Sequence, residues 1–380
     1  MKKTFLILSN LVIIAMFTAC APAAVPTPEI IVKEIVKTVE VPGEVLVTTV
    51  VETVTVEVEP TGPIILGYAG PGLDAFQAGV MYSVIRYAEG KGWKVIPADA
   101  ARDAEKQANQ IDDFISMGVS AIVAVPEDSQ AFCASVAKAV EAGIPIYSID
   151  RAPSGCEVNM VVQADNYLGG EQSAMAVVDY LKEKNGEETG TVLELQGDMG
   201  QNVAQLRSAG FNDYVKQFPG ITVVSKPTEW KAEKFFQNTL DVVGSQEVDA
   251  IYAHSDAVGT IPILQALEQL GKKIPAGTDG HIYLATIDGT PNCLTNIRQG
   301  FQDQCSSQPN PDFGILVNYI EKEFKGEAIE PGEVVQEGAP WSPAFIEESD
   351  VGLMLNLATT SVTTENVDDP TLWSNRLSIR

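Results

Sequence analysis

Two hydrophobic patterns alternate along most of the chain. From residue 63 onward, short apolar runs typical of buried strands are separated by longer segments in which apolar residues recur at helical spacing. In the first half this pattern predicts strands at 64–69, 93–97, 121–125 and 144–149, and helices at 73–89, 104–117 and 130–142. Strands separated by helices in this way are typical of right-handed βαβ units on a parallel sheet.

The same pattern starts again in the second half. It predicts helices at 168–183, 202–217, 232–243 and 260–270, and strands at 191–195, 221–224, 250–253 and 283–287. Two such series predict an α/β protein with two similar doubly wound parallel-sheet lobes. A chain of 380 residues with 45% hydrophobic residues is long enough for two cores of ordinary size. In these folds the ligand is expected at the carboxyl ends of the strands.

Polar residues, and in one case a Trp, lie just past five of the predicted strands. They are Asp150 and Arg151, Gln196 and Gly197, Trp230, His254 with Ser255 and Asp256, and Asp288 with Gly289 and Thr290. Ser255 and Asp256 could instead cap the helix that follows them, and Asp288 could begin a turn. Because five strand ends share the property, we expect a polar cleft between the two lobes.

The first twenty residues are typical of an export signal. Lys2 and Lys3 precede an apolar run at 5–17, which is shorter than the ~20 residues of a membrane-spanning helix. The segment Phe17-Thr18-Ala19-Cys20 resembles a bacterial lipobox, with Phe17 where that motif usually has Leu. The resemblance implies lipidation of Cys20 and anchoring at the outer face of a membrane. A plain secretory signal with an incidental cysteine is the alternative.

Residues 21–62 differ in composition from the rest and are dominated by Val, Thr, Glu and Pro. Their alternation of apolar and polar positions fits an extended conformation. We interpret the segment as an extended stalk between the lipid and the folded domain, with a strand pair as the alternative.

The charge of the chain excludes one class of partner. Acidic residues number 51 against 25 basic ones, for a formal net charge of −26. This charge repels phosphate backbones and anionic lipid headgroups. Nucleic acid is therefore not expected as a partner, and contact with a membrane is expected through the lipid anchor only.

Four cysteines remain beyond Cys20, an even number in an exported chain. Pairing neighbours in the sequence predicts disulfides between Cys133 and Cys156 and between Cys293 and Cys305. Metal ligation is the competing interpretation, but these cysteines form no CxxC motif and have no histidine nearby. We expect no metal.

Several of these segments together resemble the ribose-type periplasmic sugar-binding proteins of ABC transporters. The resemblance spans about residues 63 to 330 and rests on the segments at 147–151, 164–170, 194–197, 207–211 and 288–291. Sugar-responsive repressors share that fold, but here an export signal and stalk stand in place of a DNA-binding helix-turn-helix. The resemblance implies a type I periplasmic binding protein fold. Its N-terminal lobe would comprise 63–165 and about 309–335, its C-terminal lobe 166–308 and about 336–365, with 366–380 as a tail.

The resemblance also implies roles for individual residues. Asp150 and Arg151 match an acid and a base that bind adjacent ring hydroxyls, and Trp230 matches an aromatic that stacks on the sugar. Asp288 matches a hydroxyl-binding carboxylate. Further expected ligand-binding positions are Ser255, where the family usually has Asn, its neighbour Asp256, and Gln308 near a hinge crossing. The lobes would close at crossings near 164–166, at Gln308 and beyond 331.

The chain departs from the family at two places. Gln205 stands where the ribose binders have a second sugar-binding Arg, whereas Arg207 matches a structural Arg. Asp74 and Phe76, together with Gln77, stand near where the family has an Asn and paired Phe residues. Ribose itself is therefore not the expected ligand.

These residue types suit a sugar on chemical grounds as well. Carboxylates accept hydroxyl protons, Arg donates in a planar fork, and Trp covers the apolar face of a ring. The sequence contains none of the common catalytic motifs, and Arg151 is expected to keep Asp150 ionised, which would spoil it as the general acid of a glycosidase.

The sequence therefore predicts a lipid-anchored, monomeric binding protein, with no cofactor and no catalytic activity. It would deliver a monosaccharide, either a pentose or a hexose, to an ABC permease. A binding protein for a sugar alcohol, a nucleoside or a furanosyl signal, or a sensory ligand-binding module, is the alternative.

Overall fold

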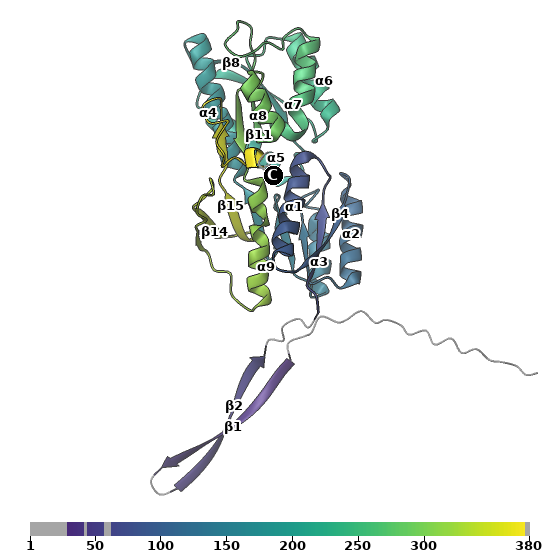
Figure 1. Cartoon of the computed structure of the whole chain (residues 1–380), viewed down its shortest axis with the longest axis vertical. Coiled ribbons are helices and arrows are strands. Elements are labelled where there is room, and N and C mark those ends of the chain that lie inside the picture. The colour runs from purple at the N-terminus through teal and green to yellow at the C-terminus, as the bar shows by residue number, and fades with distance from the viewer. Residues whose placement is uncertain (1–28, 42–43, 57–61, 377–380) are drawn as a thin grey trace, which may run out of the picture.

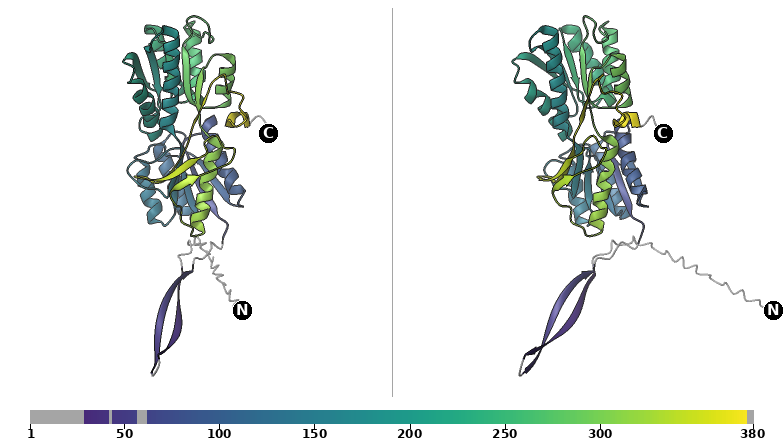
Figure 2. Two further views of the ribbon diagram at one scale, coloured as in Figure 1. Left: turned by 90° about the vertical axis from the view of Figure 1, so that its left-hand side faces the viewer. Right: turned by 60° about the vertical axis from the view of Figure 1, so that its left-hand side comes forward.

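The computed structural model describes residues 29–41, 44–56 and 62–376. The predicted export signal and Cys20 lie outside these ranges, so both the signal and the lipidation stay predictions. The main body consists of two lobes, each an α/β sandwich around its own sheet, as Figures 1 and 2 show. The α/β class and the two parallel-sheet lobes expected from the hydrophobic pattern are confirmed. In the described part of the chain, no helix has the length and hydrophobicity needed to cross a membrane.

The N-terminal lobe contains an eight-stranded sheet of order β13-β14-β15-β7-β6-β5-β3-β4. Neighbours from β15 to β4 are parallel, whereas β13 and β14 are antiparallel additions at one edge. The strands are β3 Ile65–Gly70, β4 Lys94–Asp99, β5 Ala121–Ala124, β6 Ile146–Ile149, β7 Met160–Ala164, β13 Gly332–Val334, β14 Ala344–Ser349 and β15 Gly352–Leu357. The helices are α1 Ala75–Glu89, α2 Ala104–Met117, α3 Phe132–Glu141, the 3-10 helix η1 Asn310–Ile315, and α9 Leu316–Phe324.

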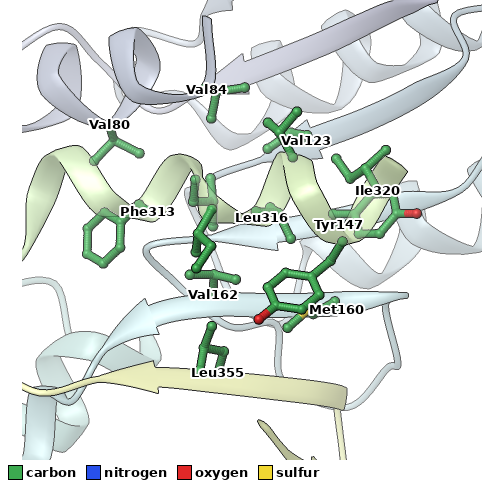
Figure 3. Close-up of a cluster of buried hydrophobic side chains, with 14 of the residues drawn as sticks. Val80, Val84, Val123, Tyr147, Met160, Val162, Phe313, Leu316, Ile320 and Leu355 are labelled. Carbon is green, nitrogen blue, oxygen red and sulfur yellow. The ribbon is translucent and has the colours of Figure 1, made fainter. Parts of the chain in front are cut away.

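The central strands of this sheet are short and fully buried, because helices cover both faces. On one face, α1, η1 and α9 pack on the sheet through a continuous apolar cluster, drawn in Figure 3. On the other face, Ile111 and Phe114 of α2 and Phe132 and Val136 of α3 form a second cluster. This rigid layer fixes the strand ends that carry the polar residues.

The C-terminal lobe contains a six-stranded sheet of order β16-β12-β11-β10-β8-β9. Helices α4 and α5 cover one face, and α6 and α7 cover the other. The strands are β8 Thr189–Gln196, β9 Gly220–Pro227, β10 Ala250–Ala253, β11 Tyr283–Asp288, β12 Gln304–Ser307 and β16 Thr360–Val362. The helices are α4 Asn166–Asn185, α5 Asn202–Val215, α6 Ala232–Ser245, α7 Asp256–Gln269 and α8 Pro291–Gln299.

The chain crosses between the lobes three times, after β7, after β12 and after β15. Two of the crossings lie side by side, since the backbone N–H of Asp165 donates to the carbonyl of Leu357 at 2.8 Å. The expected assignment of about 336–365 to the C-terminal lobe is largely wrong. β14 and β15 extend the N-terminal sheet, because β15 pairs in parallel with β7, and only β16 joins the C-terminal sheet.

The tail contacts both lobes. Val367 and Leu372 pack with Leu294 and Ile297 of the C-terminal lobe, whereas Trp373, in the short helix α10 Trp373–Arg376, packs in the core of the N-terminal lobe. The tail therefore lies across the junction, close to the hinge crossings (Figure 2).

The segment between residues 29 and 56 forms an antiparallel strand pair. Strands β1 Glu29–Val41 and β2 Glu44–Val56 pair along their whole length, from Glu29 opposite Val56 to Val41 opposite Glu44. The segment is therefore a strand pair, which was the alternative prediction, and not a single extended stalk.

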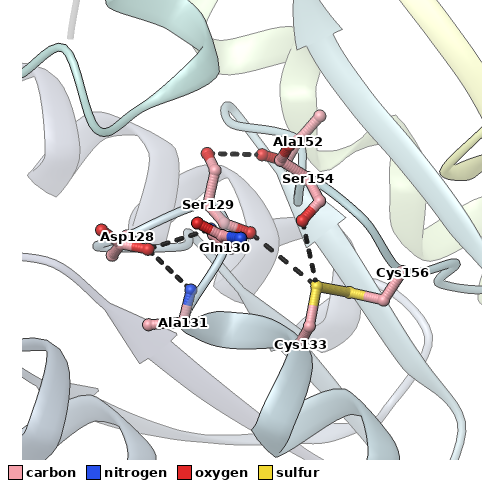
Figure 4. The surroundings of a disulfide bond; sticks show 8 residues. All are labelled: Asp128, Ser129, Gln130, Ala131, Cys133, Ala152, Ser154 and Cys156. Carbon is pink, nitrogen blue, oxygen red and sulfur yellow. Dashed lines mark hydrogen bonds between the residues drawn. A yellow bond between two sulfur atoms is a disulfide. The ribbon is translucent and has the colours of Figure 1, made fainter.

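One of the two expected disulfides is present. Cys133 near the start of α3 is bonded to Cys156, with an S–S distance of 2.11 Å, and joins α3 to the loop that follows β6 (Figure 4). Cys293 and Cys305 are free and buried, so their predicted pairing is wrong. Each sulfur has a polar partner instead: the Cys305 thiol lies 3.2 Å from Asp256 Oδ2, and Gln302 Nε2 donates to Cys293 Sγ at 3.0 Å.

Candidate ligand-binding site

A narrow pocket, partly open to solvent, lies between the lobes at the carboxyl ends of the strands. Its cavity volume is about 30 Å³, well below the ~300 to 1,000 Å³ of small-molecule sites, so a sugar can enter only if the lobes move apart. The N-terminal lobe contributes Asp74, Phe76, Gln77, Arg102, Asp150 and Arg151, and the C-terminal lobe contributes Val203, Arg207, Trp230, Ser255, Ala257, Val258 and Asp288. The lining thus combines carboxylates, guanidinium groups and two aromatic rings.

Asp150 and Arg151 follow β6 directly. Asp150 has a left-handed backbone (φ 66°), a conformation that Asp tolerates better than most residues. Its Oδ2 accepts from Gln77 Nε2 at 2.9 Å and lies 3.7 Å from Arg151 Nε. Arg151 in turn donates from Nη1 to the carbonyl of Pro126 at 3.1 Å. Both pocket residues are almost fully buried.

Burial raises the pKa of Asp150 above its ordinary value, and the opposing effects of Arg151 and of the Gln77 hydrogen bond are smaller. The net shift in the pKa of Asp150 is therefore opposite to the one expected from Arg151 alone, because desolvation outweighs the ion pair.

Asp74 and Arg102 form the outer edge of the N-terminal wall. Asp74 Oδ1 caps α1 by accepting from the backbone N–H groups of Phe76 and Gln77, at 3.0 and 2.9 Å, and Oδ2 pairs with Arg102 Nη2. Arg102 was not predicted as a site residue. It reaches the pocket from a loop in which Ala101 and Arg102 both have left-handed backbones (φ 53° and 64°).

Asp288 ends β11 and is the carboxylate that the C-terminal lobe contributes to the pocket wall. Its Oδ2 accepts from Ser255 Oγ at 2.6 Å, and its Oδ1 accepts from Gln308 Nε2 at 2.8 Å and from Arg207 Nη1 at 3.4 Å. Burial raises the pKa of Asp288 to about 8, against the opposing effect of Arg207 and with a further increase from the nearby Asp256 carboxylate. Near neutral pH this group can therefore carry a proton and donate to a ligand.

Trp230 provides the aromatic wall of the C-terminal lobe. It lies after β9 in a turn where Glu229 and Trp230 both have left-handed backbones (φ 53° and 54°). The ring packs directly on Gly197, where an added Cβ would come within 2.0 Å of it. Its Nε1 donates to Gln201 Oε1 at 2.6 Å, and the Arg207 guanidinium carbon lies 5.6 Å from the ring centroid.

Arg207, and not Gln205, lines the pocket. Helix α5 packs closely on α4, since a Cβ at Gly210 would come within 2.0 Å of the carbonyl oxygen of Tyr167, and this contact places Arg207 Nε 2.8 Å from Asn166 Oδ1. Two residues correspond to about 200° of helical rotation, so the side chain of Gln205 points away, is exposed and donates to the carbonyl of Met199. The expected ligand-binding role of Gln205 is wrong.

Two other expected residues lie behind the pocket wall. Asp256 accepts from the backbone N–H groups of Gly289 and Thr290, and so holds the turn that follows Asp288. With Cys293 and Cys305 it forms a buried cluster whose ligand-type atoms lie within 4.8 Å of one another. Gln308 reaches the pocket only through its hydrogen bond to Asp288. Both residues position Asp288 and its turn.

Some buried polar atoms around the pocket have no hydrogen-bond partner among the described residues. Three of them belong to pocket-lining side chains: Gln77 Oε1, Arg102 Nη1 and Arg151 Nε. An unsatisfied buried polar atom is costly, and most buried polar atoms in proteins are paired. A ligand with several hydroxyl groups could satisfy this one acceptor and these two donors.

The chain is similar in sequence to known periplasmic binding proteins. A family model described as "Periplasmic binding protein domain" matches residues 69–325. The chain is 31% identical to the ribose import binding protein of Bacillus subtilis over 215 residues, which covers 56% of this chain and 65% of that protein. It is 27% identical to a xylitol-binding protein of Mycolicibacterium smegmatis, over 56% of this chain and 58% of that protein. The matches thus span less than two thirds of either relative.

Among solved structures, the crystal structure of a galactofuranose binding protein is similar, with a TM-score of 0.70 and 22% sequence identity. The similarity covers 83% of this chain and 99% of that one, and it identifies the two-lobed architecture as the type I periplasmic binding protein fold. The relatives named here are binding proteins and not enzymes.

Proposed function

The chain belongs to the family of periplasmic binding protein domains, and from this premise we propose that it is the substrate-binding protein of an ABC importer. Membership of this family implies a location outside the cytoplasm. The ligand is a monosaccharide, a pentose or a hexose, held between the two lobes. The observation that supports this ligand class is the pocket between the lobes, which is lined by one unpartnered acceptor and two unpartnered donors of the N-terminal lobe and by Trp230 and Asp288 of the C-terminal lobe.

The pocket residues have different roles in binding a sugar. Asp150 and Asp288 accept from or donate to ring hydroxyls, the free N–H groups of Arg102 and Arg151 donate to them, and the indole of Trp230 covers the C–H face of the ring. Hydrogen bonds that involve these charged groups are roughly twice as strong as neutral ones. Each hydroxyl can therefore be paired when the lobes close on the sugar.

The charges of the pocket favour a neutral ligand. When the carboxylates are ionised, each guanidinium group has a counter-charge, in the pairs Arg102–Asp74, Arg151–Asp150 and Arg207–Asp288, and Arg151 also lies beside Glu127. In that state a sugar acid or a phosphorylated sugar would bring a buried charge with no free counter-charge, which is strongly unfavourable. A neutral monosaccharide leaves the three pairs intact.

A sugar alcohol is the second candidate. It offers the same neutral hydroxyl groups, and one relative is named as a xylitol-binding protein. Because an acyclic polyol has no ring face for Trp230 to cover, indole fluorescence and affinity together separate the two ligand classes.

We also propose how the protein is held in the cell envelope. Cys20 carries a lipid that anchors the protein at the outer face of the membrane, and the partner is the permease of the importer. The support is the lipobox-like segment after an apolar run, together with the extracytoplasmic location of the family. Mass spectrometry of the membrane-bound protein, with Cys20→Ser as the control, tests the anchor: an unmodified Cys20 in membrane-bound wild type contradicts it.

A thermal-shift screen of the purified protein against pentoses, hexoses and polyols, followed by calorimetry on each hit, tests the ligand class. We expect at least one neutral monosaccharide to raise the melting temperature, and uronic acids and sugar phosphates to have no effect. A screen in which no neutral sugar or polyol stabilises the protein contradicts the proposal.

A further inference from the structure

Gln201 joins the two lobes without lining the pocket. It lies just before α5 and is fully buried. Its Nε2 donates to the backbone carbonyl of Glu127 in the N-terminal lobe at 2.6 Å, and its Oε1 accepts from Trp230 Nε1 in its own lobe at 2.6 Å. One side chain thus connects the backbone of one lobe to the aromatic wall of the other.

The chemistry of these contacts is selective for an amide. The indole N–H can only donate, and a backbone carbonyl can only accept. Gln satisfies both with its two different ends, whereas Glu would keep the contact to Trp230 and lose the donor to Glu127. Gln201 also occupies the N-cap position of α5, where Gln is not a favoured residue, and its side chain makes no capping hydrogen bond.

The same segment of the N-terminal lobe also holds Arg151. Arg151 Nη1 donates to the carbonyl of Pro126 at 3.1 Å and lies 3.4 Å from Glu127 Oε2. A continuous path of hydrogen bonds and backbone therefore runs from Arg151, through residues 126 and 127 and through Gln201, to Trp230. Its two ends are pocket residues of different lobes.

Further hydrogen bonds at the same place depend on contact between the lobes. The backbone N–H of Asn202 donates to Ser129 Oγ at 3.1 Å, and the backbone N–H of Ala152 donates to Asn202 Oδ1 at 3.0 Å. These bonds break if the lobes separate at the hinge, because 200–202 and 127–152 belong to different lobes.

Trp230 needs external support for its position. A Trp with a left-handed backbone is strained, and such residues keep their conformation only where the surrounding structure holds it. Gln201 is the hydrogen-bond acceptor for its indole N–H. Closure of the lobes fixes Gln201 through Glu127, and Gln201 then fixes the ring.

We propose that Gln201 is a positioning residue that couples closure of the lobes to the orientation of Trp230 against the ligand. The inference deepens the proposed function and rests on it for the role of Trp230 as the sugar-stacking ring. The coupling between Glu127 and Trp230 across the cleft does not depend on which sugar binds.

Hydrogen–deuterium exchange of the full ligand-free protein tests the coupling without any sugar. The reporters are the backbone amides of Ala152 and Asn202, which are bonded across the lobes. Gln201→Glu and Gln201→Leu should both speed their exchange about five-fold, the effect of losing one hydrogen bond of ~1 kcal/mol. Gln205→Ala, on the exposed side of the same helix, should leave it unchanged. Unchanged exchange in the β10 amides of all variants shows that the fold is intact.

A double-mutant cycle with Trp230→Phe, which keeps an aromatic ring but lacks the N–H, separates coupling from a local structural role. If Gln201 acts through the indole, the effect of Gln201→Leu on Asn202 exchange should be smaller in the Trp230→Phe background than in wild type. Additive effects, or reporter amides that exchange at the wild-type rate in Gln201→Glu, would overturn the inference.

Titration with D-ribose, D-galactose, L-arabinose and xylitol tests whether Gln201 affects the affinity for ligand. For each probe that binds wild type, Gln201→Glu should raise Kd about ten-fold, and Gln205→Ala should not change it. An unchanged Kd in Gln201→Glu contradicts the link between Gln201 and binding. If none of the four binds wild type, the probes come from the hits of the wider thermal-shift screen; no hit in that screen contradicts the sugar assignment, whereas the exchange experiment still decides the inference about Gln201.

Discussion

The indole nitrogen of Trp373 donates a hydrogen bond to the backbone carbonyl of Asp288 at 3.1 Å, although the two residues are 85 positions apart in the chain. The same indole lies edge-on to Phe76, with ring centroids 6.4 Å apart. Phe76 and Asp288 are pocket residues of different lobes. The tail is therefore a structural part of the site, although it lies beyond the three hinge crossings.

Replacing Trp373 by Phe removes this donor from the Asp288 carbonyl and leaves a smaller ring beside Phe76. We expect the free energy of unfolding to fall by about 1–2 kcal/mol and Kd for the bound sugar to rise several-fold, because the backbone of Asp288 is held less firmly. Urea denaturation and calorimetry measure the two effects. The matched control is Trp93→Phe, since Trp93 packs on Phe324 at 5.7 Å, away from the pocket. Equal affinities in the two variants would contradict a role of the tail in binding.

The strand-end pattern predicted much of the pocket but not all of it. Asp150, Trp230 and Asp288 lie at or just past the ends of strands β6, β9 and β11, and the carboxyl ends of parallel strands meet at one edge of a sheet. Arg102 could not be found in this way, because it lies beyond the end of β4 and reaches the pocket through two left-handed non-glycine residues. Such a turn has no local sequence signature, unlike one made by glycine.

Long-range pairing accounts for the other differences. The hydrophobicity of strand β15 would allow it to join either sheet. Its parallel pairing with β7 is decided by tertiary contacts, which the local sequence does not show. The position of Gln205 depended on the rotation of α5, which its close contact with α4 determines. An even number of cysteines shows that all of them could pair, but it does not show which ones lie close enough to bond. It therefore could not exclude two buried free thiols at Cys293 and Cys305.

Asp150→Ala should remove most of the affinity for sugar. The substitution removes one of the two carboxylates beside the buried Arg151, the acceptor of Gln77 Nε2 and the group proposed to bind a ring hydroxyl, changes that together cost about 2–5 kcal/mol of binding, or roughly 30-fold or more in Kd. Calorimetry measures the loss, and Gln205→Ala, an exposed site outside the pocket, is the control with unchanged affinity. Wild-type affinity in Asp150→Ala would contradict the assigned site.

The thiols of Cys293 and Cys305 should be free but unreactive in the folded protein. Burial raises the pKa of Cys293 to about 11 and raises that of Cys305 well above its usual value, so little thiolate is present at pH 8. Iodoacetamide should label both residues after unfolding without reductant, and Cys133 and Cys156 only after reduction.

Peptide mass spectrometry gives the pattern of labels. Cys133→Ser is the control, because it frees Cys156 and should make that residue reactive without reductant. A peptide pair linked through Cys293 and Cys305, or their rapid labelling in the native state, would show that the buried free pair is wrong.

The stability of the ligand-free protein should depend on pH through Asp288. Its pKa is about 8 in the folded protein and ~3.9 when unfolded, so the folded state binds the proton more tightly. The stability associated with the protonated carboxyl is fully present below pH ~3.9 and is lost as the pH rises toward and through 8. The slope is at most ~1.4 kcal/mol per pH unit, because one proton is taken up on folding.

Asp288→Asn is neutral at every pH and removes this loss. We therefore expect the free energy of unfolding of Asp288→Asn, minus that of wild type, to increase from pH 4 to pH 8 and to stay constant above pH 8. Urea denaturation at a series of pH values measures this difference. Asp213→Asn is the control: Asp213 is exposed and the Lys216 hydrogen bond lowers its pKa, so it is ionised in both states above pH ~5 and the difference from wild type should stay constant there. If the difference for Asp288→Asn is also flat, Asp288 is ionised throughout this range. It could then only accept hydrogen bonds from a sugar and not donate one.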